Sequence, residues 1–133
     1  MICFPLDNTE YEAKDMGAYL ATRTRGVFSA DDNLKVSPGQ SGLSVTVSPG
    51  LVWHKWSPFW GTAAVLEKPL TLTLDAADGA LERIDAVVAR LDKVNNRAEV
   101  AVKKGAFSSS PSVAAPVRDE SADEVYLATV LVA

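Results

Sequence analysis

The chain has 133 residues and a formal net charge of −4, a length that fits one domain with a real hydrophobic core. Hydrophobic residues make up 47% of the sequence and charged residues 23%, which is ordinary for a globular protein and argues against wholesale disorder. The acidic balance argues against a nucleic-acid or anionic-membrane binder, and no apolar run is long enough to span a membrane.

The start of the chain carries no sign of export. Residues 1–6 lack the basic start and the long apolar core of a signal peptide. Cys3 is the single cysteine, so no disulfide can form within the chain, which fits synthesis in a reducing compartment. We therefore expect the protein to be made in the cytoplasm and not secreted by the ordinary route.

One amphipathic helix is predicted over about residues 9–25. Thr9 and Glu12 have the spacing of a capping box, and Gly26 is a natural stop. A short amphipathic helix needs a packing partner, either the domain's own sheet or the same helix of another subunit. The residues that fall on one side at helical spacing are Tyr11, Met16, Tyr19 and Leu20.

The remainder, about residues 27–133, is predicted to form short strands. Residues 34–36 are a candidate strand, and residues 43–47 alternate apolar with small polar side chains, as a half-buried strand does. Pro49 and Gly50 separate this strand from the next, which predicts a hairpin across the turn.

Residues 53–60, with the sequence WHKWSPFW, hold all three tryptophans and the only histidine. Pro58 interrupts regular pairing, so we expect a strand end followed by a projecting loop. The aromatic side chains could close one end of the core, anchor a protein interface, or stack against sugar rings. Large aromatic residues are usually highly buried, which favours core or interface over sugar binding. The aromatic candidates for an interface are Trp53, Trp56, Phe59 and Trp60.

A local three-stranded sheet is predicted between residues 69 and 104. Residues 70–74 alternate leucine with threonine, residues 84–91 are apolar on both faces as in a central strand, and residues 97–103 alternate again. Asn95 and Asn96 mark a tight reversal between the last two, because asparagine tolerates the left-handed conformation of a hairpin turn.

The C-terminal part begins with a stretch rich in serine, proline and alanine, residues 106–117, which we expect to be extended without ladder pairing. Residues 118–124 are predicted to be a charged, solvated stretch, and residues 125–132 a final strand that is apolar enough to sit centrally. Together the elements predict one domain over residues 1–133, a mainly β, antiparallel sandwich-like fold with one N-terminal helix.

The sequence offers few residues for catalysis. His54 could act as a base near neutral pH, but no nucleophile motif accompanies it, so a packing role is favoured. Glu82, Arg83 and Asp85 are expected to form an ion-pair cluster at a sheet edge. Aspartates at positions 31, 32, 75 and 78 do not have the spacing of a known calcium loop, so turn chemistry is favoured. We predict a protein that is not an enzyme and that uses no cofactor or metal.

The order of several short segments resembles the N-terminal module of siphophage and prophage tail and baseplate proteins of Gram-positive bacteria, the group that includes baseplate upper proteins and receptor-binding proteins. The resemblance spans nearly the whole chain, and its weight lies in the order and spacing of the set. The segments are YxAxDM from Tyr11, RGVF from Arg25, LKV from Leu34, LSVTVSPGLVW from Leu43, LTLTL from Leu70, RIDAVV from Arg83, AVKKG from Ala101, SSSP from Ser108 and YLA from Tyr126.

The resemblance implies a virion structural module, usually trimeric, that attaches a fibre or receptor-binding head to the tail. Expected partners are other copies of the chain and other tail or baseplate proteins, after assembly in the cytoplasm of the bacterial host. Related chains often continue into further domains, whereas this sequence stops just after its last predicted strand, so we expect an adaptor without its own head or a piece of a longer chain. The alternative function is a carbohydrate-binding module that recognises cell-wall glycan through the aromatic loop.

Overall fold

The computed structural model describes Met1, Cys3 and residues 5–133. It is mainly β, with one short helix and three antiparallel three-stranded sheets in the described residues, and it confirms the predicted fold class. The sheets have the strand orders β1-β4-β5, β2-β3-β6 and β8-β7-β9. The elements are α1 (Ala13–Leu20), β1 (Gly26–Val27), β2 (Val36–Pro38), β3 (Ser44–Val47), β4 (Gly50–Ser57), β5 (Trp60–Leu66), β6 (Leu70–Thr73), β7 (Arg83–Asp92), β8 (Arg97–Lys103) and β9 (Ala122–Val132).

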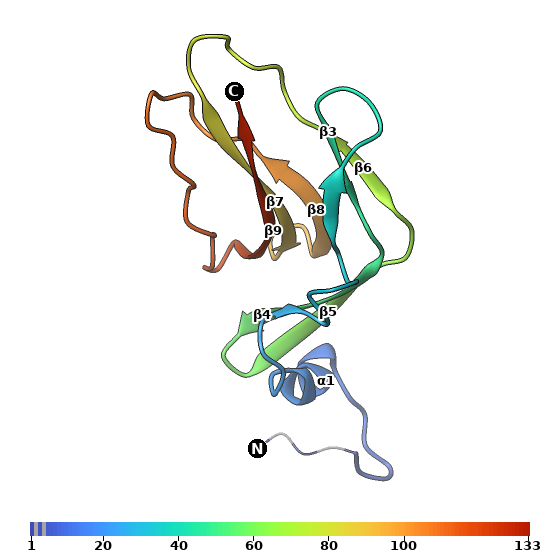
Figure 1. The fold of residues 1–133 in the computed structure, drawn as a ribbon. Coiled ribbons are helices and arrows are strands. Elements are labelled where there is room, and N and C mark those ends of the chain that lie inside the picture. The colour runs from blue at the N-terminus through green and yellow to red at the C-terminus, as the bar shows by residue number, and fades with distance from the viewer. Residues whose placement is uncertain (2, 4) are drawn as a thin grey trace.

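The molecule is elongated, and its two termini lie at opposite ends (Figure 1). The sheets β2-β3-β6 and β8-β7-β9 lie side by side in one half, and the sheet β1-β4-β5 with α1 forms the other half. The core is the place where the three sheets meet. Its buried members are Leu34, Val45, Val47, Val52, Leu74, Val87, Ala89 and Val125.

Strand β7 is the centre of its sheet, as its apolar character on both faces predicts. It pairs with β8 on one side and β9 on the other, and Val87 and Val88 are completely buried. The predicted reversal between β7 and β8 is also present, with Asn96 at a φ of 54°. The β7–β8 hairpin is therefore a local unit that the sequence specifies by itself.

Strand β9 is at the edge of this sheet, so the prediction that the last strand is central was wrong. Its apolar content has another cause, because residues 106–118 run along it outside the sheet. Tyr126 donates a hydrogen bond to the backbone oxygen of Ala114, at 2.6 Å, and Arg118 forms an isolated bridge with Asp123. Residues 106–117 belong to no strand, as predicted, apart from a bridge between Ser108 and Glu82.

A β-bulge interrupts the ladder between β7 and β9. Val87 is opposite Ala128 and Val88 is opposite Tyr126, which leaves Leu127 as an extra residue in β9. Leu127 packs against the core as a half-buried side chain.

Two predicted pairings were wrong. Strand β6 pairs with β3, in the register Val45 to Leu72 and Val47 to Leu70, and not with β7. The predicted hairpin between β3 and β4 does not form, because the two strands belong to different sheets. The chain passes straight through Gly50, whose Cα lies so close to residues 33 and 34 that a Cβ would be 2.7 Å from the nitrogen of Leu34.

The helix is shorter than the predicted 9–25. It begins after Glu12, where a capping box forms between Glu12 and Asp15 and not between Thr9 and Glu12. The hydroxyl of Thr9 donates instead to the backbone oxygen of Asp7. At the other end the hydroxyl of Thr22 donates to the backbone oxygen of Tyr19 at 2.7 Å, which satisfies a terminal carbonyl and ends the helix.

Candidate functional site

The aromatic segment forms the tip of the hairpin between β4 and β5. The ladder shifts its register between Lys55 and Ser57, so Trp56 lies in an irregular part of the strand. The rings of Trp56 and Trp60 stack on each other with centroids 5.1 Å apart and an interplanar angle of 23°. Phe59 projects from the tip with 83% of its surface exposed. The predicted projecting segment is therefore a tight hairpin with one exposed ring and one stacked pair.

Trp53 is separate from this group. It lies in the middle of β4, opposite Gly26 of β1 and Ala63 of β5. The guanidinium group of Arg23 lies 5.6 Å from the centroid of its ring, a cation–π contact that covers one face. The structure thus brings together three of the four predicted aromatic residues and leaves Trp53 apart.

Helix α1 packs on β5 through its smallest residue. Gly17 is buried directly against Trp60, so that a Cβ at this position would lie 2.2 Å from Cδ1 of the ring. Gly61 of β5 in turn lies against the backbone of Leu20. Met16 and Tyr19 point away from this contact, with 54% and 55% of their surface exposed. Leu20 therefore belongs to the packing side, whereas Met16 and Tyr19 remain on the outside.

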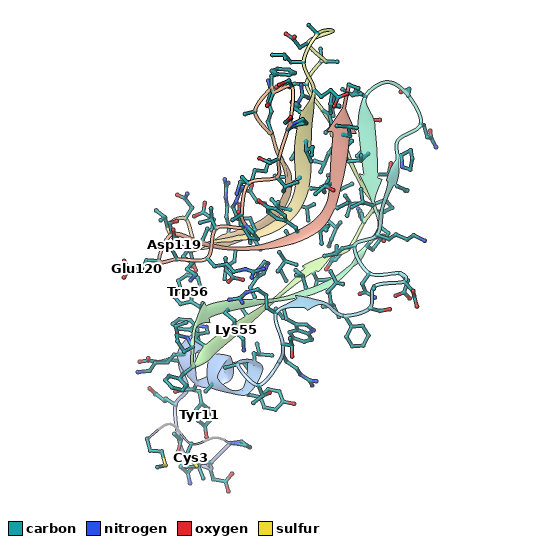
Figure 2. The ribbon with its side chains drawn as sticks, turned by 60° about the vertical axis from the view of Figure 1, so that its left-hand side comes forward. Cys3, Tyr11, Lys55, Trp56, Asp119 and Glu120 are labelled. Atoms are coloured by element: carbon teal, nitrogen blue, oxygen red, sulfur yellow. The ribbon has the colours of Figure 1, made fainter. Side chains whose placement is uncertain are left out.

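Tyr11 precedes the helix and lies near the N-terminal end of the molecule, well away from the aromatic hairpin (Figure 2). Its hydroxyl donates to the backbone oxygen of Leu6 at 3.0 Å. The predicted interface residues are thus distributed around one half of the molecule and do not form one continuous face.

A buried charged cluster joins this half to the sheet β8-β7-β9. Asp123 of β9 is 1% exposed and accepts a bond from His54 Nδ1 at 3.0 Å and a bond from Arg25 Nε at 2.9 Å. The backbone N–H of Lys55 donates to the same carboxylate at 3.2 Å. Burial alone would raise the pKa of Asp123, but the bonds from His54, Arg25 and the Lys55 backbone lower it to about 2. The carboxylate is charged, and it holds β4 against β9.

Glu124 forms a second buried cluster on the other side of β9. Its carboxylate accepts bonds from Lys103 at 2.8 Å and Arg90 at 2.6 Å, and from the backbone N–H of Val117 at 2.7 Å. Burial opposes ionisation of Glu124, but these three donors hold its pKa below the ordinary value. The bond to Glu124 in turn raises the pKa of Lys103.

Two members of the predicted cluster, Arg83 and Asp85, form an ion pair, whereas Glu82 forms an isolated backbone bridge with Ser108. The pair is fully buried and belongs to the central strand, so its predicted place at a sheet edge was wrong. Arg83 Nε donates to Asp85 at 2.8 Å, and its terminal nitrogens donate to the backbone oxygens of Asp75 and Ala76. The same oxygen of Asp85, Oδ1, also accepts the backbone N–H of Gly105 at 2.9 Å, while Oδ2 accepts from the second terminal nitrogen of Arg83 at 3.1 Å. The pair therefore attaches two segments to β7, namely the crossover after β6 and the residue that follows the end of β8. Its role is structural.

The prediction that residues 118–124 are solvated was wrong for Asp123 and Glu124. Both are 1% exposed, because cations from distant parts of the chain meet them. Arg25 is 98 positions away from Asp123 in the sequence. The only sequence signal was their place at the head of a strongly apolar strand.

An open hollow of about 470 Å³ lies beside the first cluster, where Trp56, Lys55, Asp119 and Glu120 gather (Figure 2). Its cations are already engaged, since Lys93 donates to the backbone oxygens of Trp56 and Asp119, both at 2.7 Å, and Lys55 to that of Ala21. These hydrogen bonds hold the walls of the hollow together and leave neither lysine available for a bound anion.

In the part of the chain that the structure describes, no grouping of three or more His, Cys, Asp or Glu side chains could hold a metal ion. Asp75, one of the predicted turn aspartates, pairs with Lys104 at 3.0 Å. No helix among the described residues is long and apolar enough to cross a membrane. No protein-family model, no curated protein and no solved structure matches this chain.

Proposed function

We propose that this chain is a non-enzymatic structural module of a phage or prophage virion. In this proposal it is made in the cytoplasm of the bacterial host, assembles as a homotrimer in the tail or baseplate, and attaches a fibre or a receptor-binding head. The proposal combines the resemblance of nine ordered sequence segments with the surface of the folded chain.

The observation that carries the proposal is the amount of exposed surface. The chain exposes 8432 Å², whereas a compact monomer of this mass exposes about 6,800 Å². The difference is comparable to the roughly 1,600 Å² that a subunit buries when it contributes about 800 Å² to each of two standard interfaces. Part of it comes from the exposed residues 5–12. A ring of subunits supplies two such interfaces for every chain.

The position of the exposed apolar residues supports the same proposal. Met16, Tyr19 and Phe59 are all exposed and belong to α1 and the β4–β5 hairpin, in the half of the molecule that holds the N-terminus. Large exposed apolar side chains are typical of interfaces. The termini lie at opposite ends of the elongated fold (Figure 1), which suits a module that links two structures.

The alternative, glycan recognition by the aromatic residues, has less support. Trp56 and Trp60 use one face each for their mutual stacking, and Arg23 covers a face of Trp53. Phe59 alone is left as a largely exposed ring in this hairpin. A soluble cell-wall glycan should change tryptophan fluorescence if the alternative holds, and should leave it unchanged if these residues serve packing and assembly.

The first test is the absolute mass of the protein in solution, by size-exclusion chromatography with light scattering. We expect a trimer. The double variant Met16→Ala and Tyr19→Ala should then lower the mass to that of a monomer at the same concentration, without changing the β-sheet signal in circular dichroism. Val94→Ala is the control, because Val94 is even more exposed but lies in the turn between β7 and β8, away from α1. A monomeric parent protein would refute self-assembly of the isolated chain.

A further inference from the structure

Residues 109–117, which we call the strap, lie against the outer face of the sheet β8-β7-β9. The strap begins after Ser108, which forms a bridge with Glu82, and ends before Arg118, which forms a bridge with Asp123. Between these two bridges the strap belongs to no strand. The strap and the sheet β2-β3-β6 lie on opposite sides of the sheet β8-β7-β9 (Figure 1). The strap is therefore on the face that is turned away from the core.

The register of the sheet identifies the side chains on this outer face. Val88 of β7 is opposite Ala101 of β8 and Tyr126 of β9, so these three residues form one row. Arg90 and Glu124 are opposite each other two positions further along their strands, and they therefore share the same face. The outer face thus combines an apolar row with a charged one.

Val88 is completely buried, although it belongs to the outer face. Its neighbours in the strand, Val87 and Ala89, belong to the core where the three sheets meet. Because side chains alternate along a strand, Val88 points to the opposite side. Its burial needs a cover on the outer face, and the strap is the segment that lies there (Figure 1).

Among the described residues, three side chains of the sheet bind the strap. The carboxylate of Glu124 accepts the backbone N–H of Val117 at 2.7 Å. The hydroxyl of Tyr126 and the ammonium group of Lys103 donate to the backbone oxygens of residues 114–115, at 2.6 and 3.3 Å. Lys103 also donates to Glu124 and lies 5.5 Å from the centroid of the Tyr126 ring. The attachment of the strap therefore depends on one connected cluster.

The strap itself contributes little to its own attachment. Residues 112–115 are exposed, and Pro111 and Pro116 have no N–H group to donate. A segment with few buried side chains and no ladder opens at a lower free energy than the strands beneath it. The bridges at its two ends keep the segment attached to the fold when its middle moves away.

We propose that the strap is a hinged cover that opens as a unit while the three sheets stay folded, and that Glu124 is the latch that keeps it closed. Opening breaks the bonds of Val117 and of residues 114–115, exposes Val88, and uses the two bridges at the ends of the strap as hinges. The proposal goes beyond the assembly role, because it concerns a movement within one chain.

The test measures how fast a thiol reagent reaches single cysteines on the two faces of β7. The parent for this test carries Cys3→Ser, and the matched variants are Val88→Cys on the strap face and Val87→Cys on the core face. Both positions are completely buried, so the closed chain protects both thiols. With Ellman's reagent at mildly alkaline pH, we expect the thiol of Val88→Cys to react about tenfold faster or more, because the strap opens more often than the whole fold unfolds.

The latch is tested by second substitutions in the Val88→Cys variant. Tyr126→Phe removes only the hydroxyl that binds the strap, and it should raise the labelling rate about fivefold. Glu124→Gln should raise the rate further, since hydrogen bonds to a charged group are stronger than those to a neutral one. Glu99→Gln is the matched control, because Glu99 pairs with Arg90 and with another arginine of the sheet itself. It should leave the rate unchanged.

The same second substitutions in the Val87→Cys variant separate opening of the strap from a loss of overall stability. The labelling rate at position 87 should stay at its original value in Tyr126→Phe. Equal rates at positions 87 and 88 would overturn the proposal, since both thiols would then react only through unfolding of the whole chain. A rate at position 88 that neither Tyr126→Phe nor Glu124→Gln changes, or a rise that is equal at both positions, would show that Glu124 and its cluster are not a latch. If Glu124→Gln does not fold, Tyr126→Phe decides the same point.

Discussion

At the scale of single residues, Asp123 is the side chain with the widest consequences. Its carboxylate accepts hydrogen bonds from Arg25, from His54 and from the backbone N–H of Lys55. These bonds connect the loop before β1 and strand β4 to strand β9. A charged carboxylate with several donors is stable in a buried position, but removal of its charge leaves the donors unsatisfied. The cluster therefore makes the stability of the fold dependent on pH.

We predict that this dependence appears on the acid side. The pKa of Asp123 is about 2 in the folded chain and about 3.9 in an unfolded one, so its stabilising contribution is complete above the unfolded value and is lost as the pH falls toward 2. The loss of this contribution between pH 5 and pH 3 should lower the free energy of unfolding by about 1 kcal/mol. Urea denaturation at a series of pH values should show this loss in the parent and not in Asp123→Asn. If the free energies of unfolding of the two proteins fall equally as the pH is lowered, the assignment of this loss to Asp123 is wrong.

The ion pair of Arg83 and Asp85 gives a second prediction, which concerns the melting temperature. Arg83→Met leaves a charged Asp85 buried with the N–H of Gly105 as its remaining donor, and should lower the melting temperature by roughly 10 °C. The double variant Arg83→Met and Asp85→Leu should recover part of this loss, since it removes the unpaired charge. Thermal melts followed by circular dichroism measure both. A double variant less stable than the single one would mean that the pair stabilises the fold beyond mutual neutralisation.

At the scale of elements, the attachment of α1 depends on the absence of a side chain at Gly17. Alanine favours a helix over glycine by about 1 kcal/mol, yet its Cβ would lie 2.2 Å from the Trp60 ring. That ring is stacked on Trp56 and cannot move by itself. Gly17→Ala should therefore displace the helix, change tryptophan fluorescence and lower the melting temperature by several degrees.

Lys14→Ala tests the same helix without the steric conflict, because Lys14 is exposed and its ion pair among the described residues is with exposed Glu12, at 3.6 Å. It should leave both the fluorescence and the melting temperature close to those of the parent. If Gly17→Ala is instead more stable than the parent, helix propensity outweighs the contact with Trp60, and the docking of α1 is looser than its geometry indicates.

The elements also show what local sequence can specify. The predicted strand over residues 97–103 matches β8 residue for residue, because alternation and a flanking Asn turn are both local signals. The pairing of β6 with β3 was not predictable in this way, since an alternating strand accepts any partner that covers its apolar face. The contacts of Asp123 and Glu124 were also missed, because a charged residue looks solvated until the distant cation that meets it is known.

The candidate site was predicted in part. The sequence picked out the aromatic cluster, and the structure places Trp56, Phe59 and Trp60 at one hairpin tip. The roles within the cluster depend on packing that composition does not encode, namely the stacking of two rings and the separation of Trp53.

At the scale of the whole molecule, the two halves should differ in local stability. Strand β7 is paired on both sides and contains completely buried residues, whereas α1 is held mainly through β5. Native-state hydrogen exchange should find the amides of residues 86–91 slowest and those of α1 among the fastest of the ordered amides. Similar protection in both would mean that the halves open as one cooperative unit.

The extra residue in β9 has a consequence for which length changes this molecule can tolerate. Leu127 shifts the phase of the strand, so that residues on its two sides present their side chains in different alternation. Deleting it would leave residues 122–126 opposite residues 88–92 and residues 128–132 opposite residues 83–87, as they are now, so the ladder would become regular and Asp123 would stay beside Arg25 and His54. The cost would be the half-buried side chain of Leu127, which packs against the core. Position 127 is therefore the place in β9 where the strand can lose a residue without a change of register.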